Sequence, residues 1–287
     1  MYYQDQMGNV VFLPERPQRI VSLVPSQTEL LFDLGLDAEV VGVTRFCEHP
    51  AEKCAEKTIV GGTKQFNLEQ IEALQPDLIL GNKEENYEEG INHLRQHHPV
   101  WMSDIYTLPQ ALEMILRVGK MTGRSQRAAE MVVDIQHAFS RLPSWPTLRA
   151  AYVIWRRPYR VVGHHTFAHE MLLKAGFVNT FGERARYPEV TVADIQAARP
   201  DVLLLASEPF PFTEKHLPQF REQFPGIRCV LVDGQMFTWY GSRLLQAPSY
   251  FQALRERLGT EQPAQDDRTF TSQGPQQRGQ QPGAPVS

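Results

Sequence analysis

Two segments of the chain show the same order of polar and apolar positions. They are FNLEQIEALQPDLIL, at residues 66–80, and VTVADIQAARPDVLLL, at residues 190–205. In each segment, apolar residues share one face of a predicted helix, a proline ends that helix, and a short apolar run follows. Such a run is typical of a strand that is covered on both faces. The repetition predicts two similar α/β lobes.

Polar residues that can cap a helix stand before several of the predicted helices. Asn67 precedes the first helix of the repeat and Thr191 the second, and their side-chain oxygens can accept a hydrogen bond from a free backbone N–H. Ser26 and Glu29 have the spacing of a capping box at the start of an earlier helix. Ser125 is expected to cap a long helix in the middle of the chain.

The pattern as a whole divides the chain into four parts. Residues 1–124 are predicted to form an N-terminal α/β lobe with a leading hairpin, and residues 143–258 a C-terminal α/β lobe. Residues 125–142 form the helix between them, which at ~1.5 Å per residue is roughly 27 Å long. Residues 259–287 are rich in Gln, Pro and Gly, which predicts a disordered tail. The expected fold class is α/β, with two Rossmann-like lobes, central parallel sheets and a single rigid backbone helix.

Composition narrows the classes of partner. The chain has 287 residues, 42% of them hydrophobic, and a formal net charge of −4. No run of Lys or Arg is present, so we expect no nucleic-acid partner. Cys47, Cys54 and Cys229 lack the spacing of zinc or redox sites, and we expect reduced thiols.

The first residues bear on location. MYYQDQMGNVVFLPERP has no basic start, no long apolar core and no small-residue cleavage site, so it does not resemble a secretory signal. The sequence as written is expected to be cytoplasmic, and a misassigned start codon would instead make the protein periplasmic. The apolar runs are too short for a membrane span, so we expect no membrane insertion.

Candidate binding residues follow the predicted strands, because ligands of open α/β sheets bind at the carboxyl ends of strands. Aromatic residues are frequent in these loops and indicate a cleft for a large flat or partly apolar ligand, with cationic side chains for its acidic groups. The expected ligand contacts are Pro25, Ser26, Arg45, Phe46, Lys83, Trp155, His165, Thr166, Phe167, Glu208, Phe210, Phe237, Trp239 and Tyr240.

Three histidines leave two alternatives open. His164, His165 and His169 could together bind a free zinc or manganese ion, although no carboxylate or cysteine motif of metal spacing accompanies them and no metal site is predicted. His165 or His169 could also act as acid or base in an enzyme, assisted by Glu208 or Asp233. The sequence contains no Walker loop, no G-x-G-x-x-G, no G-x-S-x-G and no H-E-x-x-H, so no catalytic residue is expected.

Several phrases in sequence order carry a resemblance to a known family. RIVSLVPSQTELLFDLG, VVGVT and NLEQIEALQPDLIL, followed by the long helix, resemble the ABC-importer substrate-binding proteins that take up cobalamin and ferric siderophores. The resemblance covers about residues 5–258. Within that class, NKEEN, YPEVT, SEPFPF and DGQMFTWYGSR are most similar to the cobalamin-binding branch and its leaderless relatives, the helical backbone metal receptors.

The resemblance implies two lobes on one rigid helix, a ligand between them and no enzymatic activity or resident cofactor. The implied ligand is a small-molecule metal chelate, first a corrinoid such as cobalamin, then a ferric siderophore or haem. Phe46 matches an aromatic contact position of the family, whereas Thr63 and Lys64 replace an aromatic residue. A rigid helix also predicts small domain motion on binding.

Docking on a permease is the point at which the sequence departs from the family. Exported relatives present a surface glutamate on each lobe to arginines of the permease, and Glu69 stands at the first of these positions. Ala193 stands at the second, and the neighbouring Asp194 is rotated by roughly 100° around the helix. We therefore hypothesise a binding protein that keeps the fold but need not dock on an importer.

Overall fold

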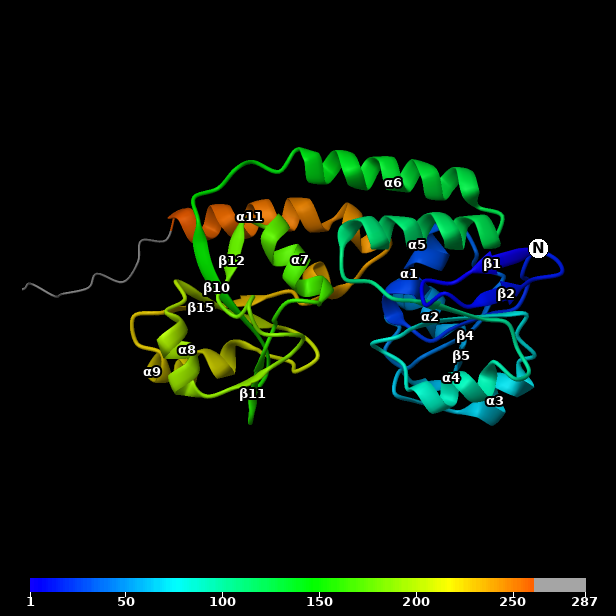
Figure 1. The fold of residues 1–287 in the computed structure, drawn as a ribbon, viewed down its shortest axis with the longest axis horizontal. Coiled ribbons are helices and arrows are strands. Elements are labelled where there is room, and N and C mark those ends of the chain that lie inside the picture. Colours follow the sequence, from blue (N-terminus) through cyan, green and yellow to red (C-terminus); the bar gives the residue numbers. More distant parts are fainter. Residues whose placement is uncertain (261–287) are drawn as a thin grey trace, which may run out of the picture.

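The computed structural model describes residues 1–260 and consists of two α/β lobes connected through α6 (Ser125–Ser140) (Figure 1). The expected tail begins at residue 259, but the final helix α11 (Ala247–Thr260) includes residues 259 and 260. The rest of the predicted tail, residues 261–287, lies outside the described residues.

Lobe 1 is built on a five-stranded sheet in the order β5-β4-β3-β8-β9, in which every neighbouring pair is parallel. Its central strand β3 and its neighbour β8 are completely buried, as their continuous apolar runs require. The strands are β3 (Ile20–Ser22), β4 (Val40–Val43), β5 (Thr58–Ile59), β8 (Leu78–Asn82) and β9 (Val100–Ser103).

Helices and two small hairpins complete lobe 1. The leading hairpin predicted from the sequence is present as antiparallel β1 (Tyr2–Gln4) and β2 (Val10–Phe12). A second hairpin, β6 (Gly61–Gly62) and β7 (Gln65–Phe66), was not predicted because each strand has only two residues. The helices are α1 (Pro25–Asp33), α2 (Ala51–Ala55), α3 (Leu68–Ala73), α4 (Glu88–Leu94) and α5 (Leu108–Met121).

Lobe 2 has a mixed sheet. β14 (Val202–Ala206) pairs in parallel with β10 (Leu148–Trp155) and with β15 (Arg228–Val232), as expected. The sequence did not predict the extension beyond β10, which holds parallel β12 and antiparallel β11 and β13. These strands are β11 (Tyr159–Val161), β12 (Phe177–Asn179) and β13 (Glu189–Val190).

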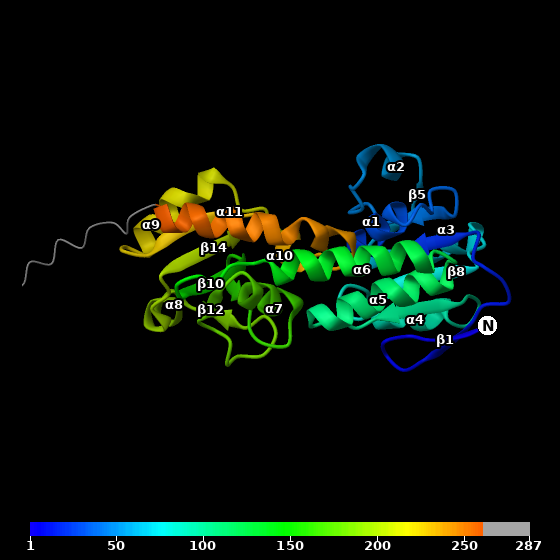
Figure 2. The ribbon, with the colours of Figure 1, turned by 90° about the horizontal axis from the view of Figure 1, so that it is seen from above.

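Helices of lobe 2 lie on both sides of this sheet (Figure 1), and α11 runs alongside α6 from the lobe 1 side to the far end of lobe 2 (Figure 2). The helices of lobe 2 are α7 (Phe167–Lys174), α8 (Val192–Ala198), η1 (Glu214–His216), α9 (Leu217–Gln223), α10 (Gln235–Thr238), η2 (Ser242–Leu245) and α11. The 3-10 helix η2 packs against both α1 of lobe 1 and α6. Within residues 1–260, no helix is both long enough and apolar enough to cross a membrane.

The two sequence repeats occupy matching places in the lobes. α3 leads into β8 and α8 leads into β14, and each of these strands lies between two parallel neighbours. The predicted caps are confirmed, since Asn67 accepts from the backbone N–H of Gln70 at 3.1 Å and Thr191 from that of Asp194 at 3.1 Å. The local chemistry of each repeat therefore produces the same unit twice.

Two of the predicted caps are wrong. The N-cap of α1 is Val24, Pro25 occupies the first turn, and no side chain caps this helix. Ser26 and Glu29 are instead buried inside the molecule, where Glu29 binds Arg243 of lobe 2. The N-cap of α6 is Arg124, again without a side-chain cap, and Ser125 is the first helical residue.

The hydrophobic core continues from one lobe into the other. One cluster of buried side chains includes Leu30 of α1, Ile135 of α6 and Leu244 of η2, together with Phe251 of α11. Because α6 and η2 both contribute to this cluster, a large rotation of the lobes would expose apolar surface to water.

Candidate functional site

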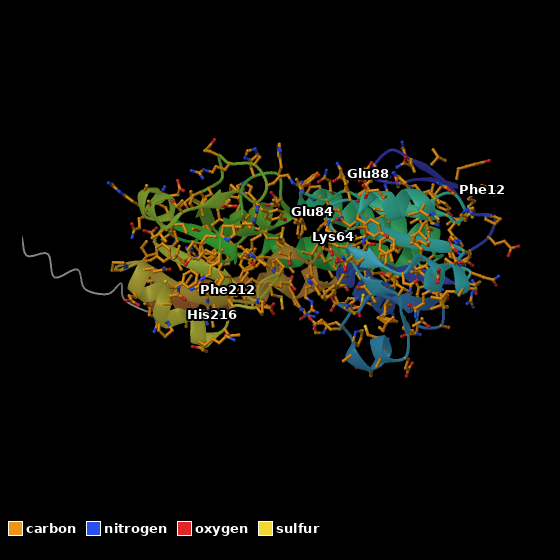
Figure 3. The ribbon with its side chains drawn as sticks, turned by 90° about the horizontal axis from the view of Figure 1, so that it is seen from below. Phe12, Lys64, Glu84, Glu88, Phe212 and His216 are labelled. Atoms are coloured by element: carbon orange, nitrogen blue, oxygen red, sulfur yellow. The ribbon has the colours of Figure 1, made fainter. Side chains whose placement is uncertain are left out.

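A cavity of about 410 Å³ lies between the lobes. Glu84 contributes from lobe 1, in the loop after β8, and the other lining residues come from lobe 2. Figure 3 shows Glu84 and Lys64 near the middle of the molecule, where the two lobes meet. The lining residues are Glu84, Ile154, Trp155, Arg160, Val162, Ala168, Arg186, Tyr187, Pro209 and Thr238. The cavity therefore has the position expected for a ligand of an open α/β sheet, beyond the carboxyl ends of strands.

An aromatic wall forms one side of the cavity. Trp155, at the end of β10, is 40% exposed and packs edge-on against Phe210 with ring centroids 5.6 Å apart. The ring of Phe210 in turn contacts Phe212 and His216 and lies below the guanidinium group of Arg156. This backing fixes the orientation of Trp155 and leaves its indole face available to a flat ligand.

Two carboxylates lie deep in the cleft beside the cavity. Glu208 accepts hydrogen bonds from the Thr238 hydroxyl at 2.6 Å and from the Trp239 indole N–H at 3.1 Å. Burial raises the pKa of Glu208 despite these two donors. Glu85 accepts from the Tyr240 hydroxyl at 2.8 Å, and burial, with a contribution from Glu208, raises the pKa of Glu85 to about 7. The floor of the cleft is therefore acidic.

Four glutamates of lobe 1 form polar contacts across the cleft. Glu29 binds Arg243 at 2.6 Å, and Glu84 binds Arg186 at 3.2 Å. Glu85 binds Tyr240 as described, and the Glu48 carboxylate accepts from the Gln235 amide at 2.5 Å. In each contact the donor belongs to lobe 2, so the two facing surfaces are complementary in charge and hydrogen bonding.

The cationic side chains of the cavity already have partners. Arg186 pairs with Glu84, and Arg160 pairs with Glu189 at 3.5 Å within lobe 2. Lys83, predicted to bind an acidic group of the ligand, instead binds Asp104 at 2.6 Å, and both residues belong to lobe 1. Carboxylates of the protein therefore already compensate the positive charges that line the cavity.

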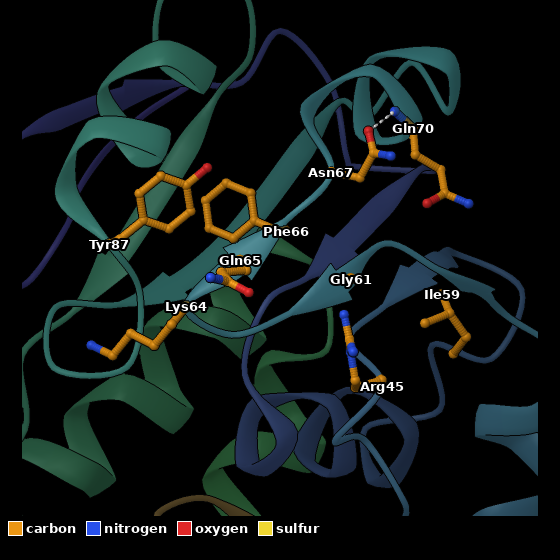
Figure 4. A pocket seen from close by; sticks show the side chains of 9 residues that line it. All are labelled: Arg45, Ile59, Gly61, Lys64, Gln65, Phe66, Asn67, Gln70 and Tyr87. Carbon is orange, nitrogen blue, oxygen red and sulfur yellow. Dashed lines mark hydrogen bonds between the residues drawn. The ribbon is translucent and has the colours of Figure 1, made fainter.

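A second hollow of about 730 Å³ lies on lobe 1 alone (Figure 4). Its lining contains two cations and no carboxylate, and the rings of Phe66 and Tyr87 pack together there at 4.5 Å. The ammonium group of Lys64 donates to the backbone oxygen of Glu84 at 2.5 Å, so the hollow and the cavity adjoin at this contact. The lining residues are Arg45, Ile59, Gly61, Lys64, Gln65, Phe66, Asn67, Gln70 and Tyr87.

The structure separates the predicted contacts into several groups. Trp155 lines the cavity and packs against Phe210, and Glu208 bonds to the lining residue Thr238 and to Trp239. Phe167 packs against Tyr240 with ring centroids 5.9 Å apart. The remaining predicted residues lie elsewhere: Arg45 in the lobe 1 hollow, with exposed Phe46 beside Gly62, and Pro25 and Ser26 buried at the start of α1.

Three further predicted contacts do not line the cavity: Phe237 and Thr166 are buried in the protein, and His165 is exposed on its surface. Phe237 is completely buried and packs against Tyr152 and Phe251, because α10 directs it into the core instead of the cleft. Thr166 is buried as the N-cap of α7 and accepts from the backbone N–H of His169. His165 is exposed and has a φ of 56°.

Sequence reasoning identified only Trp155 among the ten lining residues, and the nine that it missed include four long polar side chains. Glu84 stands next to Lys83 in the quoted phrase NKEEN, and Tyr187 opens the phrase YPEVT. Arg186 precedes Tyr187, and Arg160 lies in β11, a strand that the sequence did not predict. Position after a strand could have identified Glu84, whereas Arg160 and Arg186 reach the cavity through the antiparallel extension of lobe 2.

The histidine cluster does not form a metal site among the described residues. His164 bonds to the carbonyl of Gly182 at 3.1 Å, and His169 bonds to the Asn179 amide at 3.0 Å. Across residues 1–260, no group of three or more His, Cys, Asp or Glu side chains is arranged to hold a metal ion. The structure therefore gives no support to free zinc or manganese binding by these histidines.

Comparisons with known proteins agree with this geometry. The chain is 25% identical over 243 residues to the Vitamin B12-binding protein of Pectobacterium carotovorum, covering 80% of this chain and 86% of the relative. It is 27% identical to an uncharacterized ABC transporter substrate-binding lipoprotein, YvrC, of Bacillus subtilis, covering 70% of this chain and 67% of the relative.

Solved structures share the fold. A periplasmic heme-binding protein of Pseudomonas aeruginosa superimposes with a TM-score of 0.75 at 22% identity, covering 87% of this chain and 95% of the other. The periplasmic vitamin B12-binding protein BtuF of Vibrio cholerae gives a TM-score of 0.70 at 18% identity, covering 86% and 100%. A sequence profile named Periplasmic binding protein matches residues 20–224. This chain belongs to the periplasmic binding protein family, whose members are substrate-binding proteins of ABC transporters and not enzymes.

Proposed function

We propose that this protein binds a corrinoid, a cobalamin-like metal chelate, in the cavity between its lobes. The observation that carries the proposal is the aromatic wall of Trp155 in a cavity whose arginines are already paired with glutamates. A corrinoid ends most of its side chains in uncharged amides, which require hydrogen-bond acceptors instead of free cations. The carboxylates of Glu84, Glu85 and Glu208 supply acceptors in and beside the cavity.

The size of the cavity supports partial burial of such a ligand. A volume of about 410 Å³ is within the usual range for ligand pockets. A corrinoid is larger than this, so one edge of its ring system fills the cavity and the rest lies over the adjoining hollow of lobe 1. The vitamin B12-binding relatives match this chain over most of their length, and for this reason we place a corrinoid before haem.

Haem is the second candidate, and one observation favours it. Arg160 and Arg186 both line the cavity, and guanidinium groups bind the carboxylates of haem propionates well. Heme-binding proteins are also among the solved structures with this fold. Both arginines would have to exchange a protein carboxylate for a ligand carboxylate, which reduces the net gain.

The surface of lobe 2 lacks a glutamate at the position where the family presents one to the permease. This supports the proposal of a binding protein that need not dock on an importer through both lobes. Glu69 is exposed on α3, and Ala193 is exposed at the matching position of α8. The Asp194 carboxylate accepts from the Thr191 backbone at 2.8 Å and binds Arg184 at 3.3 Å, so it serves as a cap. Production of the chain in the periplasm should therefore fail to restore corrinoid uptake in an importer strain that lacks its own receptor. Full restoration would contradict this part of the proposal.

The function is tested by titrating the purified chain with cyanocobalamin, dicyanocobinamide, hemin and ferrichrome, followed by calorimetry and thermal unfolding. Corrinoid at ~100-fold above its dissociation constant should add roughly 2.7 kcal/mol to the free energy of unfolding. Binding of hemin alone would replace the proposal by the second candidate, and binding of none of the four would refute both.

A pair of tryptophan variants locates the ligand. Trp155→Ala should weaken corrinoid binding about tenfold, or roughly 1.4 kcal/mol, because the aromatic wall is lost. Trp145→Ala is the matched control, since Trp145 packs against Arg255 and Gly176 away from the cavity. Equal affinities in the two variants would show that the ligand lies elsewhere.

A further inference from the structure

Two arginines line the cavity, and they differ in one respect. Arg160 pairs with Glu189 at 3.5 Å, and both belong to lobe 2. Arg186 pairs with Glu84 at 3.2 Å, and this pair joins lobe 2 to lobe 1. One cationic group of the cavity is thus neutralised within a lobe and the other across the cleft.

The pair between Glu84 and Arg186 forms part of the cavity boundary. Both side chains line the cavity and remain 25% and 48% exposed, while the paired oxygen of Glu84, Oε1, is itself buried. The backbone of Glu84 is held by Lys64 through its carbonyl oxygen at 2.5 Å. The ion pair therefore borders the space that a ligand would fill.

We propose that Glu84 and Arg186 form a specificity-determining strap, which admits chelates with an uncharged periphery and disfavours chelates with free carboxylates. The inference rests on the proposed binding of a chelate in this cavity. It assigns to these two residues the choice between ligand classes and the holding of the lobes across the cavity.

A ligand carboxylate gains little binding free energy at Arg186, because this side chain already pairs with a protein carboxylate. A ligand carboxylate that binds Arg186 either displaces Glu84 or shares the guanidinium group with it, so it gains little further charge compensation. In either case the Glu84 carboxylate stays close to the carboxylate of the ligand, and like charges repel. A ligand with amide groups can instead donate to Glu84 while the ion pair stays in place.

The decisive variant is Glu84→Gln, which keeps the side-chain shape and removes the charge. We expect hemin to bind about fivefold more tightly than to the wild type, because Arg186 becomes available without repulsion. Dicyanocobinamide should bind about two- to threefold more weakly, because a neutral amide oxygen replaces the charged acceptor of its amide groups. Its dissociation should become faster, because the strap no longer holds the lobes.

Glu189→Gln is the matched control. It frees Arg160, the other arginine of the cavity, without touching a contact between the lobes. It should raise the affinity for hemin but leave the dissociation rate of dicyanocobinamide unchanged. If Glu84→Gln and Glu189→Gln have the same effect on dissociation, the strap does not hold the lobes and that part of the inference is wrong.

A measurement without ligand separates this inference from the proposed function. Amide hydrogen exchange at residues 83–87 and 184–188 should be faster in Glu84→Gln than in the wild type and should return toward wild type in Glu84→Arg/Arg186→Glu. Unchanged exchange would overturn the bridging role. An unchanged preference between hemin and dicyanocobinamide in Glu84→Gln would overturn the specificity role. If no chelate binds the wild type, the proposed function is refuted, and the specificity role is refuted with it.

Discussion

Among residues 1–260, two glutamate–arginine pairs connect the lobes, and they differ mainly in their access to water. Glu29 and Arg243 lie at the base of the cleft, 2.6 Å apart and 9% and 8% exposed, with the guanidinium group over the ring of Trp239. Glu84 and Arg186 lie beside the cavity, 3.2 Å apart, and are far more exposed. The same two residue types thus form a buried contact and a partly exposed one.

The difference teaches that depth, and not residue type, decides what such a pair does. Removal of one partner from a buried pair leaves a charge that neither water nor protein compensates. Removal of one partner from a solvated pair leaves a charge that water stabilises. Loss of the base pair should therefore cost more stability than loss of the cavity pair, whereas the cavity pair is the one that a ligand can reach.

The largest expected effect is on the base pair. Arg243→Met should lower the free energy of unfolding by about 3–5 kcal/mol, because Glu29 remains buried without its partner. Urea unfolding measures this change. Glu29→Leu/Arg243→Met should be clearly more stable than Arg243→Met alone, since no buried charge is then left. A loss below about 1 kcal/mol in Arg243→Met would contradict the distinction between the two pairs.

The next effect concerns pH and Glu85, which stands beside Glu84 in sequence and binds Tyr240. The pKa of Glu85 is raised from 4.5 to about 7 by burial, so the folded state holds a proton that the unfolded state releases. Its contribution to stability is fully present below about pH 4.5 and is lost as pH rises through about 7. Glu85→Gln should remove this part of the pH dependence between pH 5 and 8.

Urea unfolding of wild type and Glu85→Gln at several pH values measures the difference. Glu189→Gln is the control, because Glu189 belongs to an exposed ion pair of lobe 2, and its profile should keep the fall in stability toward pH 8. Parallel profiles for Glu85→Gln and the wild type would show that Glu85 does not titrate near neutral pH.

A smaller effect is expected for the cavity pair itself. Glu84→Gln should lower the free energy of unfolding by less than about 1 kcal/mol, because the pair is partly exposed. The loss should shrink further in 0.5 M salt, since ions screen such pairs. If Glu84→Gln lowered the free energy of unfolding as much as Arg243→Met does, and independently of salt, the two pairs would not differ in the way proposed.

The smallest expected effect is on overall shape. The base pair and the core that continues through α6 and η2 oppose a large rotation of the lobes. Solution scattering should therefore show nearly the same radius of gyration with and without corrinoid. A strong contraction on ligand addition would mean that the base of the cleft is a hinge.

Much of the fold could be predicted from short stretches of sequence. The repeated helix-to-strand unit, the caps Asn67 and Thr191 and the strand at residues 40–43 depend on neighbours within a few residues. Hydrophobic periodicity and capping act over that range, so they can be recognised without a structure. Two-residue strands such as β6 and β7 carry too little pattern to be recognised.

The site was decided by contacts between distant parts of the chain. Glu29 has the local spacing of a capping box with Ser26, yet it binds Arg243, 214 positions away, because η2 packs on α1. Lys83 was expected in the site, but it is Glu84 beside it that lines the cavity, while Lys83 turns to Asp104. The sequence by itself determined the two lobes and most of their helices and strands, since these depend on local patterns. Only the tertiary structure decided which charges face the cleft and which are neutralised, because the docking of one lobe on the other sets both the distance between two charges and the water around them.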